Sequence, residues 1–593
     1  MAAVLHKLRD RQAASNAPED IESHAAIHAP ASDTKLADIV RSDVHGEKLP
    51  TQDAQNGVQK MEAVTLAWSK KSLAGLLCLI WLLFLTNGMR LSILYSLLPY
   101  VTSDFQSHSL TTTIGIVADA MSAATYIPTA KMLDVWGRAE GFMVMVGSAT
   151  LGLILMAVSR NLVTFAAAQI FYQVGFSGLI YVVCVLAADA TDLRNRGLAF
   201  AFTSSPYMIT AFAGSKAAEE FLDHVNWRWG FGCFAIILPV FATPLYVVLK
   251  VNLNKAKKAG VWEKKSSGRT LRQSLWHWLV QFDLPGVVLL AGGVTVFLLP
   301  FTLAASAPQG WKTPYIIAMI ITGFVTLALF ALYQTYLSPA PFMKHKFLTD
   351  RSVLAACLID LTYQTSYYCW SSYFTSFLQV VANVSVSNAG YIGNTFSIVS
   401  GALLFLVGWL IRFTGRIRWL FFCAVPTYIF AQGLMMYFRK PNVGVGYLVM
   451  CEIFISIGGA VFILCMQLVV LAAVDHQHVA AALAMLFVSG TVGGAIGNAI
   501  SGSIWTNTFA AALKRNLPAS AQPDLAAIYA SLPTQLGYPV GSPERTAIQE
   551  SYGYAQTRML AAGVGIMSLS FIWMFVMRDF KVAKIQQMKG MVL

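Results

Sequence analysis

Long apolar stretches recur throughout this chain of 593 residues, and each is close to the length of about 20 residues that a helix needs to cross a lipid bilayer. Charged residues make up only 12% of the chain and hydrophobic residues 56%, so a soluble fold could not cover its apolar surface with polar side chains. The sequence therefore predicts an all-α membrane protein with about fourteen transmembrane helices. The predicted spans lie near residues 72–99, 111–131, 141–158, 162–187, 197–218, 229–249, 283–304, 314–336, 352–378, 389–411, 418–437, 445–472, 479–504 and 558–578.

Basic residues fix the predicted orientation of these spans. Lys and Arg collect in alternate loops, and cytoplasmic loops are the ones in which they accumulate. Both termini are then cytoplasmic, and the net charge of +13 needs no nucleic-acid partner, for which the sequence carries no module. A glycosylation acceptor, Asn383-Val-Ser385, falls on the external side. The cytoplasmic set contains Arg138, Arg194, Arg196, the cluster from Lys250 to Arg272, Lys344, Lys346, Arg412, Arg416, Arg418, Lys581, Lys584 and Lys589.

One polar turn occurs twice, as Ala130-Lys-Met-Leu-Asp134-Val-Trp-Gly137-Arg138 and as Gly408-Trp-Leu-Ile-Arg412-Phe-Thr-Gly415-Arg416. The repeat indicates two homologous halves, and such halves move against each other around a central site in transporters. Gln169 in span 4 and Glu452 in span 12 occupy equivalent places. The predicted parts are a disordered cytoplasmic tail (1–71), a six-helix half (72–249), a basic cytoplasmic loop (250–282), two intervening helices (283–336), a second six-helix half (352–578) with an external loop (505–557), and a cytoplasmic tail (579–593).

The first copy of the turn resembles the signature loop of the major facilitator superfamily, and we expect both copies to form a cytoplasmic gate. Gly137 permits a turn that a Cβ would obstruct, and Asp134 and Arg138 can pair or cap helix ends. We expect these groups to hold the inner ends of the halves together. The gate candidates are Asp134, Gly137, Arg138, Asp192, Arg194, Arg412, Gly415, Arg416 and Asp475.

Four ionisable residues fall inside predicted spans, where desolvation makes them costly and marks them as functional candidates. Arg90 and Asp119 are expected at similar depth, where they could pair; the pair is either a substrate or proton site or a structural ion pair. Asp360 and Glu452 either carry a proton coupled to transport or are hydrogen bonded to a neighbouring helix.

Span 9 is rich in amphipathic rings, whose polar atoms need a partner or a wet cavity in mid-membrane. They either line a cavity for a large polar ligand or pack between helices. The rings are Tyr363, Tyr367, Tyr368, Trp370 and Tyr373, and Tyr207 in span 5 adds another.

Several stretches together resemble the fungal siderophore–iron transporters, a fourteen-span branch of the major facilitator superfamily. They are Gln55–Ala63 with Trp68, Leu85–Arg90, Gln173–Gly178, Asp189–Gly197, Ser204–Phe212, Asn226–Phe231 and the long external loop. The resemblance implies import of ferric siderophores by proton symport, at the plasma membrane or in endosomal vesicles. Hydroxamate chelates such as triacetylfusarinine C are the expected cargo, and the external loop is expected to help capture it through Tyr552 and Tyr554.

The resemblance implies no cofactor and no protein metal site, since iron travels inside the chelate. We expect a monomer whose partners are the chelate, protons and the bilayer. A drug or glutathione exporter of the same superfamily is the nearest alternative, although Ser205-Pro206 replaces the glycine-rich pattern of such exporters. A non-transporting nutrient sensor is a further alternative. No catalytic motif indicates an enzyme.

Overall fold

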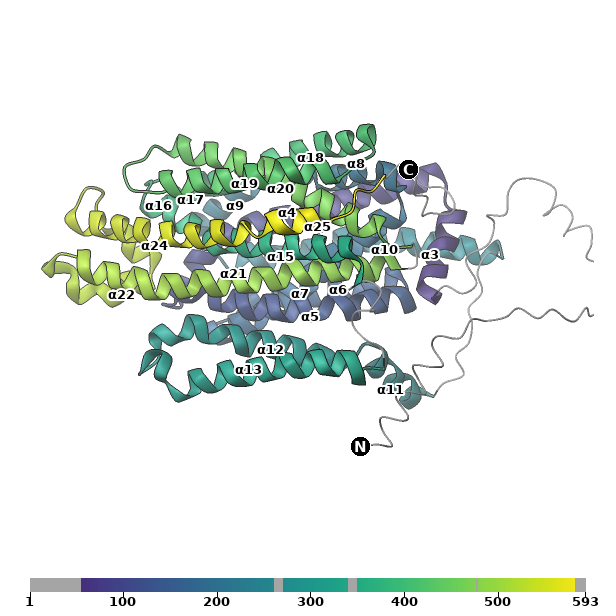
Figure 1. Ribbon diagram of the computed structural model, residues 1–593, viewed down its shortest axis with the longest axis horizontal. Helices are drawn as coiled ribbons and strands as arrows, with labels where there is room; N and C mark the ends of the chain where they lie inside the picture. Colours follow the sequence, from purple (N-terminus) through teal and green to yellow (C-terminus); the bar gives the residue numbers. More distant parts are fainter. Residues whose placement is uncertain (1–54, 261–269, 340–348, 476–477, 582–593) are drawn as a thin grey trace, which may run out of the picture. The chain divides into compact units, whose positions relative to one another are not determined.

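The computed structural model describes residues 55–260, 270–339, 349–475 and 478–581. These residues form helices joined by short turns, with one isolated β-bridge between Arg416 and Lys581 (Figure 1). Most of the predicted tail 1–71, part of the basic loop 250–282, and the segment with Lys344 and Lys346 lie outside the described residues. The end of the helices that carries Asp134 and Arg138 is called the inner end below, following the predicted orientation, and the opposite end the outer end.

The first half contains five long helices and one broken span. The broken span consists of α8 (Leu193–Ser204) and α9 (Pro206–Glu220), which meet where Pro206 lacks the N–H that a continuous helix would need. The long helices are α4 (Lys70–Asp104), α5 (Thr111–Val135), α6 (Arg138–Val158), α7 (Leu162–Asp189) and α10 (Trp229–Lys258).

Between the halves, the short helix α11 (Leu271–Gln281) leads into the helices α12 (Leu284–Leu303) and α13 (Pro314–Leu332), which pack against each other (Figure 1). The second half contains α15 (Arg351–Ser371), α16 (Phe374–Val380), α17 (Val386–Gly393), α18 (Thr395–Thr414), α19 (Arg418–Phe438), α20 (Val445–Ala472), α21 (Val479–Asn516), α24 (Pro543–Met567) and α25 (Ser570–Val576).

Twelve helices in the described part are long and apolar enough to cross a membrane. The predicted spans at 197–218 and 352–378 are not among them, although both segments are helical. The first is divided between α8 and α9, and α15 carries an aspartate and many hydroxyl side chains that lower its hydropathy. The count of fourteen spans therefore stays a prediction.

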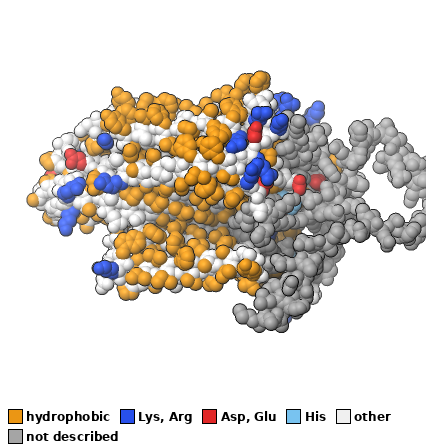
Figure 2. Space-filling model, in the orientation of Figure 1, with side chains coloured by type: hydrophobic (Ala, Val, Ile, Leu, Met, Phe, Trp, Pro, Cys, Tyr) orange, Lys and Arg blue, Asp and Glu red, His pale blue; other side chains and the backbone are white. Residues whose placement is uncertain are grey.

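The surface of the long helices suits a lipid environment. Hydrophobic side chains cover their flanks, whereas Lys, Arg, Asp and Glu gather toward the two ends (Figure 2). α13 shows the pattern most strongly, with Ile321 and Phe324 each more than half exposed. Exposed apolar surface of this extent is expected for helices that face acyl chains.

The segment predicted as a long external loop, 505–557, is mostly an extension of two spans. α21 continues to Asn516 and α24 already begins at Pro543. Only residues 517–542 connect them, through a 3-10 turn (Ala519–Asp524), α22 (Leu525–Ala530) and α23 (Leu532–Gly537). We call residues 505–557 the outer extension.

A further helix, α3 (Asn56–Ala67), precedes the first span and lies within the segment predicted as a disordered tail. It packs against α5 and α10, and Val58, Met61 and Val64 are buried. A Cβ on Gly57 would come within 2.2 Å of the Leu133 carbonyl oxygen, so the helix lies directly on the first polar turn. Residues 56–67 are thus an ordered part of the first half rather than a disordered tail.

Candidate functional site: a cavity between the two halves

A cavity of about 570 Å³ lies between the two halves. Helices α4, α5, α7 and α9 supply its wall from the first half, and α15, α18, α20 and α21 from the second. The eight residues predicted to bind cargo or protons all line it, and their roles stay predictions. These residues are Arg90, Asp119, Tyr207, Asp360, Tyr363, Tyr367, Trp370 and Glu452.

Arg90 is held by neutral and aromatic groups. Its Nη2 donates to Asn87 Oδ1 at 2.7 Å, and its Nη1 donates to the Tyr172 hydroxyl. The guanidinium carbon lies 3.8 Å from the centre of the Phe176 ring, within cation–π range. Its Nε has no hydrogen-bond partner among the described residues.

The expected pairing of Arg90 with Asp119 is wrong for this conformation. The ion pairs of the described residues do not include it, and Asp119 instead accepts from Asn498 Nδ2 at 3.1 Å and from Gln173 Nε2 at 3.4 Å. Sequence spacing indicated a similar depth but not the direction of the side chains. Arg90 and Asp119 therefore present separate charges to one cavity.

Asp360 lies where α15 crosses the glycine-rich face of α21. A Cβ on Gly490 would come within 2.4 Å of Asp360 Oδ2, and one on Gly493 within 2.4 Å of the Leu361 carbonyl oxygen. A Cβ on Gly497 would likewise come within 2.6 Å of the Thr365 carbonyl oxygen. These glycines let two helices from the second half approach closely, which brings the carboxylate to the cavity wall.

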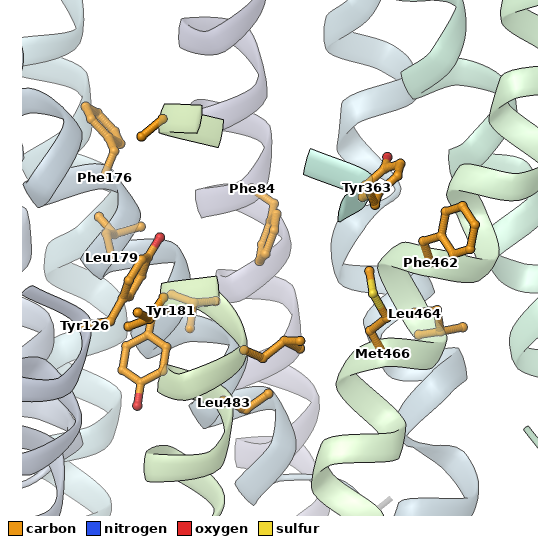
Figure 3. Packing of buried hydrophobic residues seen from close by; sticks show 14 of the residues in the cluster. Phe84, Tyr126, Phe176, Leu179, Tyr181, Tyr363, Phe462, Leu464, Met466 and Leu483 are labelled. Carbon is orange, nitrogen blue, oxygen red and sulfur yellow. The ribbon is translucent and has the colours of Figure 1, made fainter. Parts of the chain in front are cut away.

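The aromatic residues of span 9 divide between cavity wall and packing. Tyr363 packs on Tyr428 and Phe462, with ring centres 5.4 and 5.1 Å apart, and the close-up in Figure 3 shows it beside Phe462. In the first half, the Tyr207 hydroxyl accepts from Asn87 Nδ2 at 2.6 Å. Both predicted alternatives apply together, since these rings line the cavity and also pack against each other.

Tyr373 does not line the cavity but helps to close its outer end. Its hydroxyl donates to the Ser109 carbonyl oxygen at 2.9 Å, and its ring stacks on Trp505 at 4.2 Å. Ser109 in turn donates to the Tyr529 carbonyl oxygen at 2.8 Å. Three groups of the second half thus hold one turn of the first half, residues 108–110.

The inner end is closed by neutral contacts between the halves. The Tyr181 hydroxyl donates to the Ala480 carbonyl oxygen at 2.7 Å, and Tyr126 packs on Phe487. α8 and α18 meet where a Cβ on Gly408 would lie 3.1 Å from the carbonyl carbon of Gly197. Contacts between the two halves therefore lie at both the inner and the outer end of the cavity in this conformation.

The expectation that charged residues join the halves at this gate is wrong. Arg138 pairs with Asp134 at 3.3 Å and with Asp189 at 2.9 Å, and all three belong to the first half. Within the described ranges, no ion pair bridges the two halves. The buried triad instead fixes the inner ends of α5, α6 and α7 to one another.

The remaining gate candidates are more exposed. Asp192 is half-buried directly before α8, Arg194, Arg412 and Asp475 are exposed, and Arg416 pairs with Asp579 at 3.7 Å. Both predicted turn glycines adopt positive φ, +118° at Gly137 and +66° at Gly415, which confirms the backbone reason for glycine there.

The two tyrosines predicted to capture cargo in the outer extension are not on a free surface. Tyr552 is fully buried against Trp505 and Phe509, and its hydroxyl donates to Gln535 Oε1 at 2.7 Å. Tyr554 is half-buried beside Arg558, whose guanidinium lies 3.4 Å from the ring centre. Tyr552 therefore holds the outer extension together and cannot touch cargo in this conformation.

The predicted glycosylation acceptor lies in the outer turn between α16 and α17. Asn383 is exposed, but its Oδ1 accepts from Arg545 Nη2 at 3.1 Å. Its φ of +54° places it in the left-handed region, which asparagine tolerates. Modification at Asn383 stays a prediction.

Sequence reasoning missed several residues at these sites. Asp189, which pairs with Arg138, was not among the gate candidates, and its sequence signal is a carboxylate at the end of an apolar run. Tyr95, His108 and Asn498 line the cavity, yet each stands singly among apolar or small residues and gives no pattern. Arg439 lies just beyond a predicted span, where an arginine normally faces water, and here it is fully buried.

Comparison with known proteins identifies the family of the chain. Residues 80–359 match the Major Facilitator Superfamily. The siderophore iron transporter mirB of Emericella nidulans is 63% identical over 98% of this chain and 96% of its own length. The MFS siderochrome iron transporter 1 of Gibberella zeae is 61% identical over 92% and 90%, and the MFS siderochrome iron transporter B of Aspergillus fumigatus 56% identical over 96% and 91%.

Solved structures share the fold at low sequence identity. A bacterial homologue of the human lysosomal transporter Spinster, in an inward-facing and unoccupied conformation, covers 86% of this chain and 97% of its own, with a TM-score of 0.51 and 13% identity. The peptide transporter POT in complex with sulfate covers 88% and 99%, with a TM-score of 0.50 and 16% identity. Together with the relatives of more than half identical sequence, these findings show that the chain belongs to the siderophore iron transporters of the major facilitator superfamily.

Proposed function

We propose that this protein imports ferric siderophores by proton symport, through alternating access of one central cavity. The observation that carries the proposal is the convergence of charged, amide and aromatic side chains from both halves on a single cavity. Relatives with more than half of their sequence identical are named siderophore or siderochrome iron transporters, which supports the same cargo class here.

The lining of the cavity favours a large chelate without strong net charge. Three carboxylates, Asp119, Asp360 and Glu452, face the cavity together with Arg90. A strongly anionic ferric complex would meet repulsion from ionised carboxylates at short range. Amide and phenol groups can hydrogen bond to the carbonyl oxygens of a neutral hydroxamate chelate such as ferric triacetylfusarinine C. Iron enters as cargo inside this chelate.

Proton symport requires a buried group whose protonation changes as the cavity faces one side and then the other. Carboxylates in a low-dielectric cavity are suited to this role, because neutralisation relieves the cost of burying their charge. The cavity offers three of them, and we propose that at least one takes up a proton from the outside together with the chelate and releases it inside.

Alternating access then follows from the two closed ends. Opening the outer end requires residues 108–110 to separate from Tyr373, Trp505 and Tyr529. Opening the inner end requires α8 and α7 to separate from α18 and α21. We propose that the protein works as a monomer in the plasma membrane or in endosomal vesicles, with both termini in the cytoplasm.

Uptake measurements in yeast that lacks its own siderophore transporters test this function. Cells expressing the protein are given a panel of radio-iron chelates, including ferric triacetylfusarinine C, with and without a protonophore. We expect saturable accumulation of a hydroxamate chelate that the protonophore abolishes. Absence of uptake with the protein present at the surface, or resistance caused by drug efflux, would instead support an exporter.

A further inference from the structure

A row of buried polar side chains runs along one face of α19, inside the second half. Tyr428, Gln432 and Arg439 are each fully buried and lie one to two helical turns apart. The Tyr428 hydroxyl, the Gln432 Nε2 and the Arg439 Nε and Nη2 have no hydrogen-bond partner among the described residues. Buried polar groups in proteins are normally hydrogen bonded, so this row is an unusual feature that packing alone does not explain.

Arg439 lies over a break in span 9. α15 ends at Ser371 and α16 begins at Phe374, and the Arg439 Nη1 is 3.5 Å from the carbonyl oxygen of Trp370. Its guanidinium carbon lies 4.0 Å from the centre of the Phe374 ring and 4.9 Å from that of Trp370. A cation at the C-terminal end of a helix interacts favourably with the exposed carbonyls, so Arg439 connects the two sides of the break.

Glu452 on α20 is the acidic counterpart of Arg439. It is 1% exposed, it lines the cavity, and its Oε1 has no hydrogen-bond partner in the described part of the chain. Arg439 attracts it electrostatically without a direct ion pair. The other titratable side chains that act on Glu452 or Arg439 are neutral phenols and a thiol: Tyr363 and Tyr367 on α15, Tyr428 on α19 and Cys451 on α20.

The other two carboxylates of the cavity lack this arrangement. Asp119 accepts hydrogen bonds from two side-chain amides, and Asp360 lies against Gly490 of α21. Like Glu452, neither forms an ion pair with a described residue, but among the described residues no buried arginine acts electrostatically on either of them, as Arg439 does on Glu452. Glu452 is therefore the carboxylate whose charge can be transmitted to a second buried charge.

The break in span 9 also carries the outer closure of the cavity. Tyr373 lies within the break, donates to the Ser109 carbonyl oxygen and stacks on Trp505. A change in the position of Arg439 over Trp370 and Phe374 would act on the residues that flank Tyr373. The interactions thus run from the cavity carboxylate, through its electrostatic attraction to Arg439, to the outer gate.

We propose that Glu452 is the residue that carries the transported proton, and that Arg439 transmits its charge state to the break between α15 and α16. This inference rests on the proposed symport. While Glu452 is ionised, its attraction holds Arg439 over the break and keeps Tyr373 against Ser109. A proton from the outside converts the carboxylate to the neutral acid, Arg439 loses its counter-charge, and the outer gate opens. The proton leaves to the cytoplasm once the cavity opens inward.

Transport by Glu452→Gln tests the first part of the proposal. Purified protein in proteoliposomes is assayed for accumulation of iron-55 triacetylfusarinine C driven by a pH gradient, and separately for exchange of the chelate at equal concentrations on both sides. We expect accumulation to fall by about tenfold or more while exchange is retained, because the amide imitates the protonated acid. Retained exchange also shows that the variant is folded.

The matched control for this assay is Glu550→Gln, which removes an exposed carboxylate from α24. It should accumulate the chelate as the unaltered protein does. Accumulation by Glu452→Gln at the unaltered rate, with Asp119→Asn or Asp360→Asn uncoupled instead, would overturn the assignment.

Labelling of the outer gate tests the second part and needs no cargo. Thr375→Cys places a thiol on the cavity wall just beyond the break, and a membrane-impermeant maleimide added from outside reports opening. We expect labelling to accelerate by about fivefold or more as the external pH falls, and this pH response to disappear in Glu452→Gln and in Arg439→Gln backgrounds. Lys440→Gln removes the neighbouring exposed cation and should leave the response intact.

An unchanged pH response in both buried-charge variants would refute the relay. The relay and the proposed function fail in different ways. A protein that accumulates no chelate but still shows Glu452-dependent labelling would contradict the proposed import and leave the relay intact.

Discussion

At equivalent positions of the repeat, the two halves of this protein bury charge at opposite ends. In the first half, Arg138, Asp134 and Asp189 form a buried triad at the inner end. Arg416, which holds the equivalent position to Arg138 in the repeated turn, has a side chain that is 55% exposed and forms an ion pair with Asp579 at 3.7 Å. The same ancestral turn therefore became a fixed anchor in one half and a solvent-exposed contact in the other.

At the outer end the relation is reversed. The first half has neutral Gln169 where the second has Glu452, and at the same spacing Met156 corresponds to Arg439. Gln169 and Met156 are buried like their counterparts, so burial is shared and charge is not. A pair of homologous halves thus divides its tasks, with a rigid inner anchor in the first half and a charge-responsive outer region in the second.

Replacing each of the two equivalent arginines by glutamine is the strongest test of this comparison. Arg138→Gln leaves Asp134 and Asp189 buried without a cation, and we expect a loss of about 3–5 kcal/mol in the free energy of unfolding. Arg416→Gln removes an exposed pair and should cost about 1 kcal/mol or less. Thermal unfolding of the two purified variants in one detergent measures the difference. Equal destabilisation would mean that the halves are not divided as described.

The glycines at which spans 4 and 12 pack on neighbouring helices allow a second comparison of the two halves. A Cβ on Gly175 would come within 2.2 Å of the backbone nitrogen of Ala149, whereas one on Gly458 would meet the Tyr428 Cβ at 2.8 Å. The approach at Gly175 is the closer of the two, so Gly175→Ala should destabilise the protein by about 1–3 kcal/mol and Gly458→Ala by less. Gly433→Ala, where nothing lies within 4 Å, serves as the control for both unfolding measurements. A larger effect at Gly458 would contradict the expectation.

The turn glycines give a smaller contrast between the same two turns. Gly137 has a φ of +118° and Gly415 a φ of +66°. An alanine can enter the left-handed region at about 1–2 kcal/mol, but the backbone at Gly137 lies outside it. We therefore expect Gly137→Ala to reduce surface expression more than Gly415→Ala, measured by quantitative labelling of intact cells. The reverse order would show that neighbouring contacts rather than φ decide.

The smallest effect is expected for Tyr552→Phe, which tests the role of this tyrosine in the outer extension of the second half. Loss of the hydroxyl leaves Gln535 Oε1 without its donor. Such a loss costs about 1–3 kcal/mol in the free energy of unfolding, and we expect a value in the lower part of this range. The KM for chelate uptake should not change, since the ring is buried away from the cavity. A raised KM with unchanged stability would restore the capture role predicted from the sequence.

The general architecture follows from sequence because its causes are local. The length of the apolar runs predicted the long helices. The repeated turn predicted the two halves, and its glycines indicated the unusual backbone found at Gly137 and Gly415. The cavity residues were also identifiable as a set, since an ionisable residue or a tyrosine inside an apolar helix has few explanations. Predicting that these residues line one cavity did not require knowing their individual contacts.

Side-chain partners could not be obtained this way. Arg90 and Asp119 share a depth, but rotation of α4 and α5 about their axes decides whether they meet, and sequence spacing does not contain that rotation between helices. The pairing of Asp189 with Arg138 could not be predicted for the same reason. Arg439 was missed because its position after an apolar run looks solvent-exposed, whereas aromatic rings of α15 and α16 cover it.

The low hydropathy of α15 has a consequence for how the chain is made. Asp360 and the hydroxyl side chains beside it make this segment a poor substrate for insertion into lipid on its own, since an aspartate at the centre of a helix adds about 2.5–3.5 kcal/mol to the apparent cost. Its close partner, the glycine face of α21, is synthesised more than a hundred residues later. During translation we expect α15 to wait beside the insertion machinery or earlier helices until α21 arrives, so a helix that supplies a cavity carboxylate is also among the last to reach its final place in the membrane.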